Sequence, residues 1–80
     1  MYKHEKWMRE AIKEAIKAES HGEVPVGAVV IKDGVIIGKG HNQPISMNDA
    51  TAHAEIQAIR SAGKALKNYR LKGASIYITL

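Results

Sequence analysis

Two apolar segments separated by only two residues place the strongest constraint on how this chain can fold. Residues 26–32 form an almost continuous apolar run, residues 35–38 form another, and Asp33-Gly34 lies between them. Aspartate and glycine both tolerate positive φ angles, so this dipeptide favours the tight turn of a two-stranded hairpin. The sequence therefore predicts antiparallel strands at residues 26–32 and 35–38.

Helical periodicity is found on both sides of this hairpin. From about Lys3 to Glu19, apolar residues recur at three- and four-residue spacing, which predicts an amphipathic helix ending near Gly22. A second helix is expected after the polar loop 41–50, with Asp49 or Thr51 as its cap. The apolar stripes expected to be buried are Met8, Ala11, Ile12, Ala15 and Ile16 in the first helix, and Ala52, Ile56, Ile59 and Ala62 in the second.

A third strand is expected at residues 74–80, where apolar and polar side chains alternate with a period of two. The predicted order is then helix, strand, strand, helix, strand, within a single domain. A hairpin followed by a helical crossover implies an α/β fold with a mixed sheet and helices on both of its faces.

Composition excludes several classes of protein and site. The 80 residues include no cysteine, so no disulfide forms and no thiolate can bind a metal. No apolar run approaches the roughly 20 residues that cross a bilayer, and the charged start lacks a signal-peptide core, so we expect a cytoplasmic protein. The charged residues after Glu55 are all basic and can meet a phosphate backbone or form an ordinary solvated surface; they are Arg60, Lys64, Lys67, Arg70 and Lys72.

The residues best suited to chemistry are His53 and Glu55, near the start of the second predicted helix. An imidazole at such a position can bind zinc, and a carboxylate two residues later can lie beside zinc-bound water without binding the metal. Zinc lowers the pKa of its water to about 7, and the carboxylate can then transfer the proton. A His-x-Glu triplet alone is also compatible with a structural histidine and with a glutamate that favours a helix start.

Five segments of the sequence together resemble a known family. In order along the chain they are Glu23-Val24-Pro25-Val26-Gly27-Ala28-Val29, His41-Asn42, Thr51-Ala52-His53-Ala54-Glu55, Asn68-Tyr69-Arg70-Leu71 and Tyr77-Ile78-Thr79-Leu80. Their residues and spacing closely resemble the bacterial tRNA-specific adenosine deaminases, which belong to the cytidine/deoxycytidylate deaminase-like zinc deaminases. The resemblance implies a cytidine-deaminase-like fold and the zinc-dependent hydrolysis of a tRNA wobble adenosine to inosine.

The resemblance also implies a role for each matching residue. His53 corresponds to a zinc ligand and Glu55 to the catalytic proton-transfer residue. Asn42 corresponds to a residue that contacts the target nucleotide. Pro25 and Val26 match residues that line the base pocket, and Ala54 matches a residue whose backbone contacts the base. The implied partners are a tRNA anticodon loop and a second copy of the complete protein.

The family pattern continues into Pro-Cys-x-x-Cys, which supplies two further zinc ligands. This chain contains neither cysteine, so we expect residues 1–80 to be the N-terminal part of a single deaminase domain, truncated after the third strand and inactive alone. The complete protein would hold one zinc ion per subunit. Two alternatives remain open: a deaminase of a free base such as guanine or cytosine, and a non-catalytic remnant that binds RNA or a partner protein.

Overall fold

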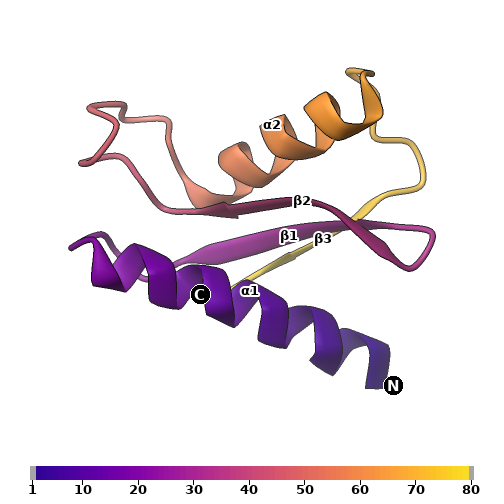
Figure 1. Cartoon of the computed structure of the whole chain (residues 1–80), viewed down its shortest axis with the longest axis horizontal. Coiled ribbons are helices and arrows are strands. Elements are labelled where there is room, and N and C mark those ends of the chain that lie inside the picture. The colour runs from indigo at the N-terminus through magenta and orange to yellow at the C-terminus, as the bar shows by residue number, and fades with distance from the viewer. Residues whose placement is uncertain (1, 80) are drawn as a thin grey trace.

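A central sheet with one helix on each face forms the fold (Figure 1). The structure is a computed structural model that describes residues 2–79. Its elements are α1 (Tyr2–Ser20), β1 (Gly27–Lys32), β2 (Val35–His41), α2 (Ala54–Leu66) and β3 (Ser75–Ile78). The predicted element order and the helices on both faces are confirmed. Neither helix of this described part combines the length and apolar character needed to cross a membrane.

The predicted hairpin joins β1 to β2. Asp33 and Gly34 have φ angles of 52° and 73°, as a turn with two left-handed residues requires. The second strand is longer than predicted, because β2 continues through Lys39 and Gly40 to His41. The pairing shifts between Val30 and Ile31, so β2 carries an irregularity within this otherwise regular ladder.

The strand order in the sheet is β2-β1-β3. Both β2 and β3 pair antiparallel with β1, so they run parallel to each other with β1 between them. The connection through α2 therefore passes over β1 and joins β2 to β3, which are not neighbours in the sheet. This is why the described strands contain no parallel pair, which differs from the mixed sheet expected from the sequence.

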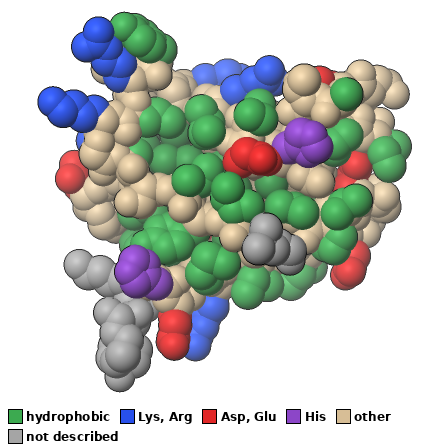
Figure 2. Space-filling view, turned by 180° about the vertical axis from the view of Figure 1, so that it is seen from behind, with side chains coloured by type: hydrophobic (Ala, Val, Ile, Leu, Met, Phe, Trp, Pro, Cys, Tyr) green, Lys and Arg blue, Asp and Glu red, His purple; other side chains and the backbone are tan. Residues whose placement is uncertain are grey.

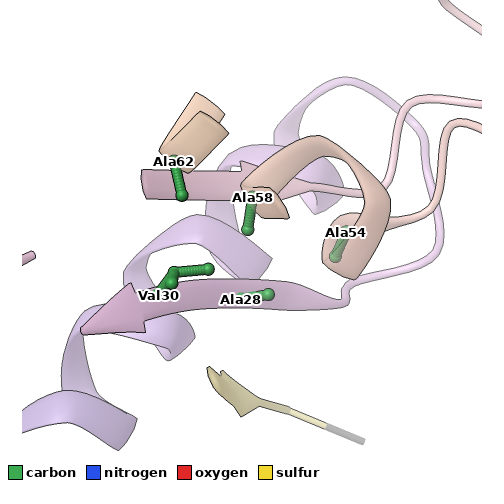
Figure 3. Close-up of a cluster of buried hydrophobic side chains, with 5 residues drawn as sticks. All are labelled: Ala28, Val30, Ala54, Ala58 and Ala62. Carbon is green, nitrogen blue, oxygen red and sulfur yellow. The ribbon is translucent and has the colours of Figure 1, made fainter. Parts of the chain in front are cut away.

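Both helices pack directly on backbone, at glycines of the sheet. A Cβ atom at Gly38 would lie 2.7 Å from the Ala62 nitrogen, and one at Gly40 would clash with the carbonyl oxygen of Ala54. On the opposite face, a Cβ atom at Gly27 would clash with the backbone of α1. Figure 3 shows the resulting α2 contact, in which alanines meet the β1 side chains; its residues are Ala28, Val30, Ala54, Ala58 and Ala62.

This close approach explains why the predicted helix stripes were partly wrong. Alanines, with Trp7 and Glu14, form the buried side of α1, whereas Ile12 and Ile16 are 48% and 59% exposed. In α2 the buried residues are alanines, and Ile59 is 42% exposed. A helix lying this close to a sheet accommodates alanine better than isoleucine along the line of contact. The α1 side chains that are buried include Trp7, Ala11, Ala15 and Ala18.

The β3 strand is shorter than predicted and forms one edge of the sheet, with no partner on its outer side among residues 2–79. Residue 80, included in the prediction, lies outside the described residues. Ile76 and Ile78 are 40% and 37% exposed, and Figure 2 shows hydrophobic side chains gathered over a large part of the rear face. An apolar edge strand is a template for pairing with another chain.

We therefore expect the 80-residue chain to self-associate through β3. Ile78→Lys should raise the concentration at which dimers and larger species form, because a lysine at an edge disfavours strand pairing. Sedimentation velocity over a concentration series measures this. Val35→Lys is the matched control, since Val35 is exposed on the other edge strand. Equal effects of the two substitutions would contradict pairing through β3.

Candidate active site

Asn42 joins the end of the hairpin to the start of α2. Its side chain is 7% exposed, and its Oδ1 atom accepts a hydrogen bond of 2.8 Å from the Ala54 N–H. Its own backbone N–H donates to the Val26 carbonyl oxygen at 3.0 Å. Asn42 thus brings together segments that are far apart in the sequence, and three of the predicted site residues meet here.

The second helix begins later than predicted. Ala54 is its first residue and His53 is the N-cap, in an extended conformation and without a capping bond from its own side chain. Asn42 performs that function from another part of the chain, because it accepts the bond from the first helical N–H. Asp49 and Thr51, the predicted caps, instead bond to each other within the loop. The side-chain and backbone bonds from Thr51 lower the pKa of Asp49.

His53 and Glu55 lie on either side of Ala54 at this helix start. The His53 side chain is exposed, and no hydrogen bond joins its imidazole to another residue of the described part. Its backbone is held by bonds from the His53 N–H to the Thr51 oxygen and from the Gln57 N–H to the His53 oxygen. Glu55 is half-buried in the first turn, where the helix dipole favours a negative charge.

The available ligands do not complete a metal site. His53 has a free imidazole that suits zinc, but no three side chains of the His, Cys, Asp or Glu type converge within residues 2–79. A catalytic zinc site uses three protein ligands. His53 therefore qualifies as one ligand, and the remainder of such a site is not contained in the described residues.

Pro25 and Val26 precede β1 and differ in their exposure. The Pro25 side chain is exposed, whereas Val26 is half-buried and packs against the cluster of Ala28 and Ala54. Both residues belong to the segment that Asn42 joins to α2 through the Val26 carbonyl. Of the two residues, Val26 thus lies against the cluster that contains Ala54, the first residue of α2.

Glu23 is a buried acidic residue that is not among the predicted site residues. It is 5% exposed, and its carboxylate accepts bonds from the Ile45 N–H at 3.1 Å, the Ser46 N–H at 2.7 Å and the Ser46 hydroxyl at 2.8 Å. Burial acts to raise the pKa of Glu23, but these bonds and the nearby His21 outweigh it and lower the pKa. In the sequence, this position is notable only as part of the family segment that contains Val24 and Pro25. Its role could not be inferred from neighbouring residues, because its hydrogen-bond partners are more than twenty residues away.

Comparison with known families shows to which family this chain belongs. All 80 residues match the family model described as the cytidine and deoxycytidylate deaminase zinc-binding region. The chain belongs to this deaminase family. The recognition made from the five sequence segments is confirmed, and zinc is the metal of the region that matches.

Individual deaminases agree with this assignment. The tRNA-specific adenosine deaminase of Buchnera aphidicola (subsp. Schizaphis graminum) is 54% identical over 74 residues, which are 92% of this chain and 49% of that protein. That of Bacillus subtilis is 50% identical over 80 residues, which are 100% of this chain and 50% of that protein. The chain thus spans about half the length of these curated relatives.

Solved structures confirm the cytidine-deaminase-like fold. One comes from a study of A-to-I editing by tRNA:A34 deaminases at the wobble position; it has a TM-score of 0.89 and 46% identity, over 92% of this chain and 57% of that one. Another is the guanine deaminase of Bacillus subtilis, with a TM-score of 0.88 and 42% identity, over 94% of this chain and 48% of that one.

Proposed function

We propose that residues 1–80 are the N-terminal part of a single tRNA-specific adenosine deaminase domain, which hydrolyses the wobble adenosine of a tRNA to inosine. The observation that carries the proposal is the arrangement around Ala54. Its N–H is held by Asn42, and His53 and Glu55 flank it at the start of α2. A metal ligand, a proton-transfer group and a polar side chain beside an apolar wall are the parts that hydrolytic deamination of a planar base needs.

Each residue has a distinct role in this proposal. His53 would hold zinc through its free imidazole, and Glu55 would receive a proton from water and deliver it to the base without binding the metal. Asn42 would orient the nucleotide with the part of its amide that Ala54 does not engage. Pro25, Val26 and the Ala54 backbone would enclose the base. Zinc, when bound, supplies a water of lowered pKa.

The remaining assignments depend on the complete protein. We propose one zinc ion per subunit, with two cysteine ligands from outside residues 1–80, and a cytoplasmic homodimer that binds a tRNA anticodon loop. The exposed basic residues of α2 and the following segment suit contact with RNA phosphates. Lys64 lies some ten residues along α2 from Ala54, or about 15 Å along its axis, so this contact would be remote from the adenosine.

Guanine deamination is the second candidate function. The guanine deaminase of Bacillus subtilis shares 42% identity with the chain, only slightly less than the tRNA:A34 deaminase structure. The curated tRNA-specific relatives reach 54%, which favours the tRNA substrate. A non-catalytic remnant is a weaker proposal, because such a role gives no reason for His53 and Glu55 to lie together at the start of α2.

An enzyme completed with the missing C-terminal half distinguishes the tRNA substrate from guanine. Residues 1–80 are joined to the C-terminal half of the Bacillus subtilis tRNA-specific relative, and inosine and xanthine formation are measured with tRNA and with guanine. We expect inosine in the tRNA, about one zinc ion per completed chain, and far less than one in the 80-residue chain, because His53 alone does not hold the metal. Xanthine without inosine would support the guanine alternative. Near-stoichiometric zinc in the 80-residue chain would contradict the assigned ligand set.

A further inference from the structure

Glu23 connects the end of α1 to the loop between β2 and α2 by hydrogen bonds. Its backbone N–H donates to the Ala18 oxygen at 3.0 Å, which closes the end of α1 beside Gly22 with its φ of 75°. Its carboxylate accepts three bonds from Ile45 and Ser46 in the loop between β2 and α2. Glu23 therefore fixes the loop directly to the end of α1.

The loop reached by Glu23 leads from Asn42 to His53 and contacts α2 at Gln57. Its base is closed by the bond from the Gln43 N–H to the Ala52 oxygen. Its tip contacts Gln57, whose side-chain amide lies 2.7 Å from the sulfur of Met47. Glu23 is the residue that holds the middle of this loop from outside, since the other bonds of residues 44–50 in the described structure come from the loop itself or from α2.

The chemistry of the contact requires a carboxylate. Three donors point at two acceptor oxygens, and a carboxylate has enough lone pairs to accept them all. A glutamine in the same place would present N–H groups to one set of donors and would lose at least one bond. The lowered pKa of Glu23 keeps its carboxyl group ionised at neutral pH, which makes these bonds charge-assisted.

We propose that Glu23 is a positioning residue for substrate binding: it holds loop 43–50 in place where the loop contacts α2 at Gln57, so that the loop forms a wall of the nucleotide site. The proposal rests on the proposed function, because the wall matters only if a nucleotide binds beside Asn42 and His53. Ile45 is 71% exposed, so the loop presents an apolar side chain to solvent next to the bonds that Glu23 accepts. A loop released from Glu23 would present that surface in many orientations.

Two measurements test the proposal, with Glu19→Gln as the matched control. Glu19 is an exposed glutamate at the end of the same helix, and no hydrogen bond joins its side chain to the loop in the described structure. In the 80-residue chain, Glu23→Gln should speed amide hydrogen exchange at Ile45 and Ser46 about tenfold or more, because bonds to a charged acceptor are lost. Exchange at Gln43 and in α1 should stay within about twofold.

The second measurement separates binding from chemistry in the completed enzyme. Glu23→Gln should raise KM for the tRNA about tenfold while kcat stays within about twofold, because the loop orders substrate but takes no part in proton transfer. Ser46→Ala removes one of the three bonds and leaves Glu23 in place, so it should change both readouts in the same direction by less. Glu19→Gln should change neither.

Unchanged exchange at Ile45 and Ser46 would overturn the proposal, and so would a lowered kcat with unchanged KM. If the completed wild-type enzyme forms no inosine, the proposed function fails by itself. In that event faster exchange in Glu23→Gln, together with weaker binding of the same tRNA, would still support the positioning role, whereas faster exchange with unchanged tRNA binding would overturn it.

Discussion

Gly40→Ala is expected to abolish the cooperative unfolding transition of the chain. A Cβ atom at this position would clash with the backbone of Ala54 and Ala58 and would lie 2.8 Å from the Gln57 Cβ atom. Because backbone atoms cannot move aside as a flexible side chain does, α2 would have to lift from β2. We expect a loss of about 3 kcal/mol or more, a large share of the stability of a domain this small. Urea unfolding followed by circular dichroism measures it.

The control for this prediction is Gly63→Ala, on the helix that Gly40 supports. A Cβ atom at Gly63 would find its nearest neighbour at 3.6 Å, the Asn68 oxygen, which is an ordinary contact. Alanine favours a helix interior over glycine by roughly 0.5–1 kcal/mol, so this variant should be as stable as the wild type or slightly more. A wild-type melt for Gly40→Ala would mean that α2 does not lie on the glycines of β2.

The other large effect concerns His53 and Glu55 in the completed enzyme. Glu55→Gln should lower inosine formation by roughly 10²- to 10⁴-fold, the range that general acid–base groups contribute, and should leave the zinc content unchanged. His53→Ala should remove metal and activity together, because a three-ligand site would be reduced to two. Zinc analysis and single-turnover assays on the same preparations separate the two roles.

Glu10→Gln is the control for general effects of lost acidic charge. Glu10 lies on α1, where Lys13 binds its carboxylate at 2.8 Å, so it belongs to the helix on the opposite face of the sheet from α2. This variant should retain both zinc and activity. If Glu55→Gln lost its zinc, Glu55 would have to be a metal ligand, and the assignment of proton transfer to it would be wrong.

The parts of the fold that local sequence determines could be predicted. Asp33-Gly34 specifies a turn through the φ angles that its two residues accept, and the periodicity of residues 3–19 specifies a helix by itself. Which side of α1 is buried was harder to predict from the sequence. Ile12 and Ala11 are both apolar, and only the glycine beneath α1 decides that the smaller residue faces the sheet.

The candidate site shows the same division between local and long-range information. The motif segments located His53, Glu55 and Asn42, although their catalytic roles are still predictions. The start of α2 could not be located, because the side chain that accepts its first N–H belongs to Asn42, twelve residues away, whereas Asp49 and Thr51 offered a local cap. Glu23 lies in one of the family segments, but its structural role could not be predicted, because the bonds to its carboxylate come from residues 45 and 46.

The glycine and alanine contact between β2 and α2 has an entropic consequence for the site. Glycine and alanine have no side-chain rotamers, so forming this contact costs no rotamer entropy and leaves no alternative side-chain arrangement in which the helix could settle. Ala54 is one of these contact residues and also the first residue of α2. The backbone between His53 and Glu55 is therefore placed against Gly40 by a contact for which no side chain has to select a rotamer. The hydrogen bond from the Ala54 N–H to the Asn42 side chain adds to this contact.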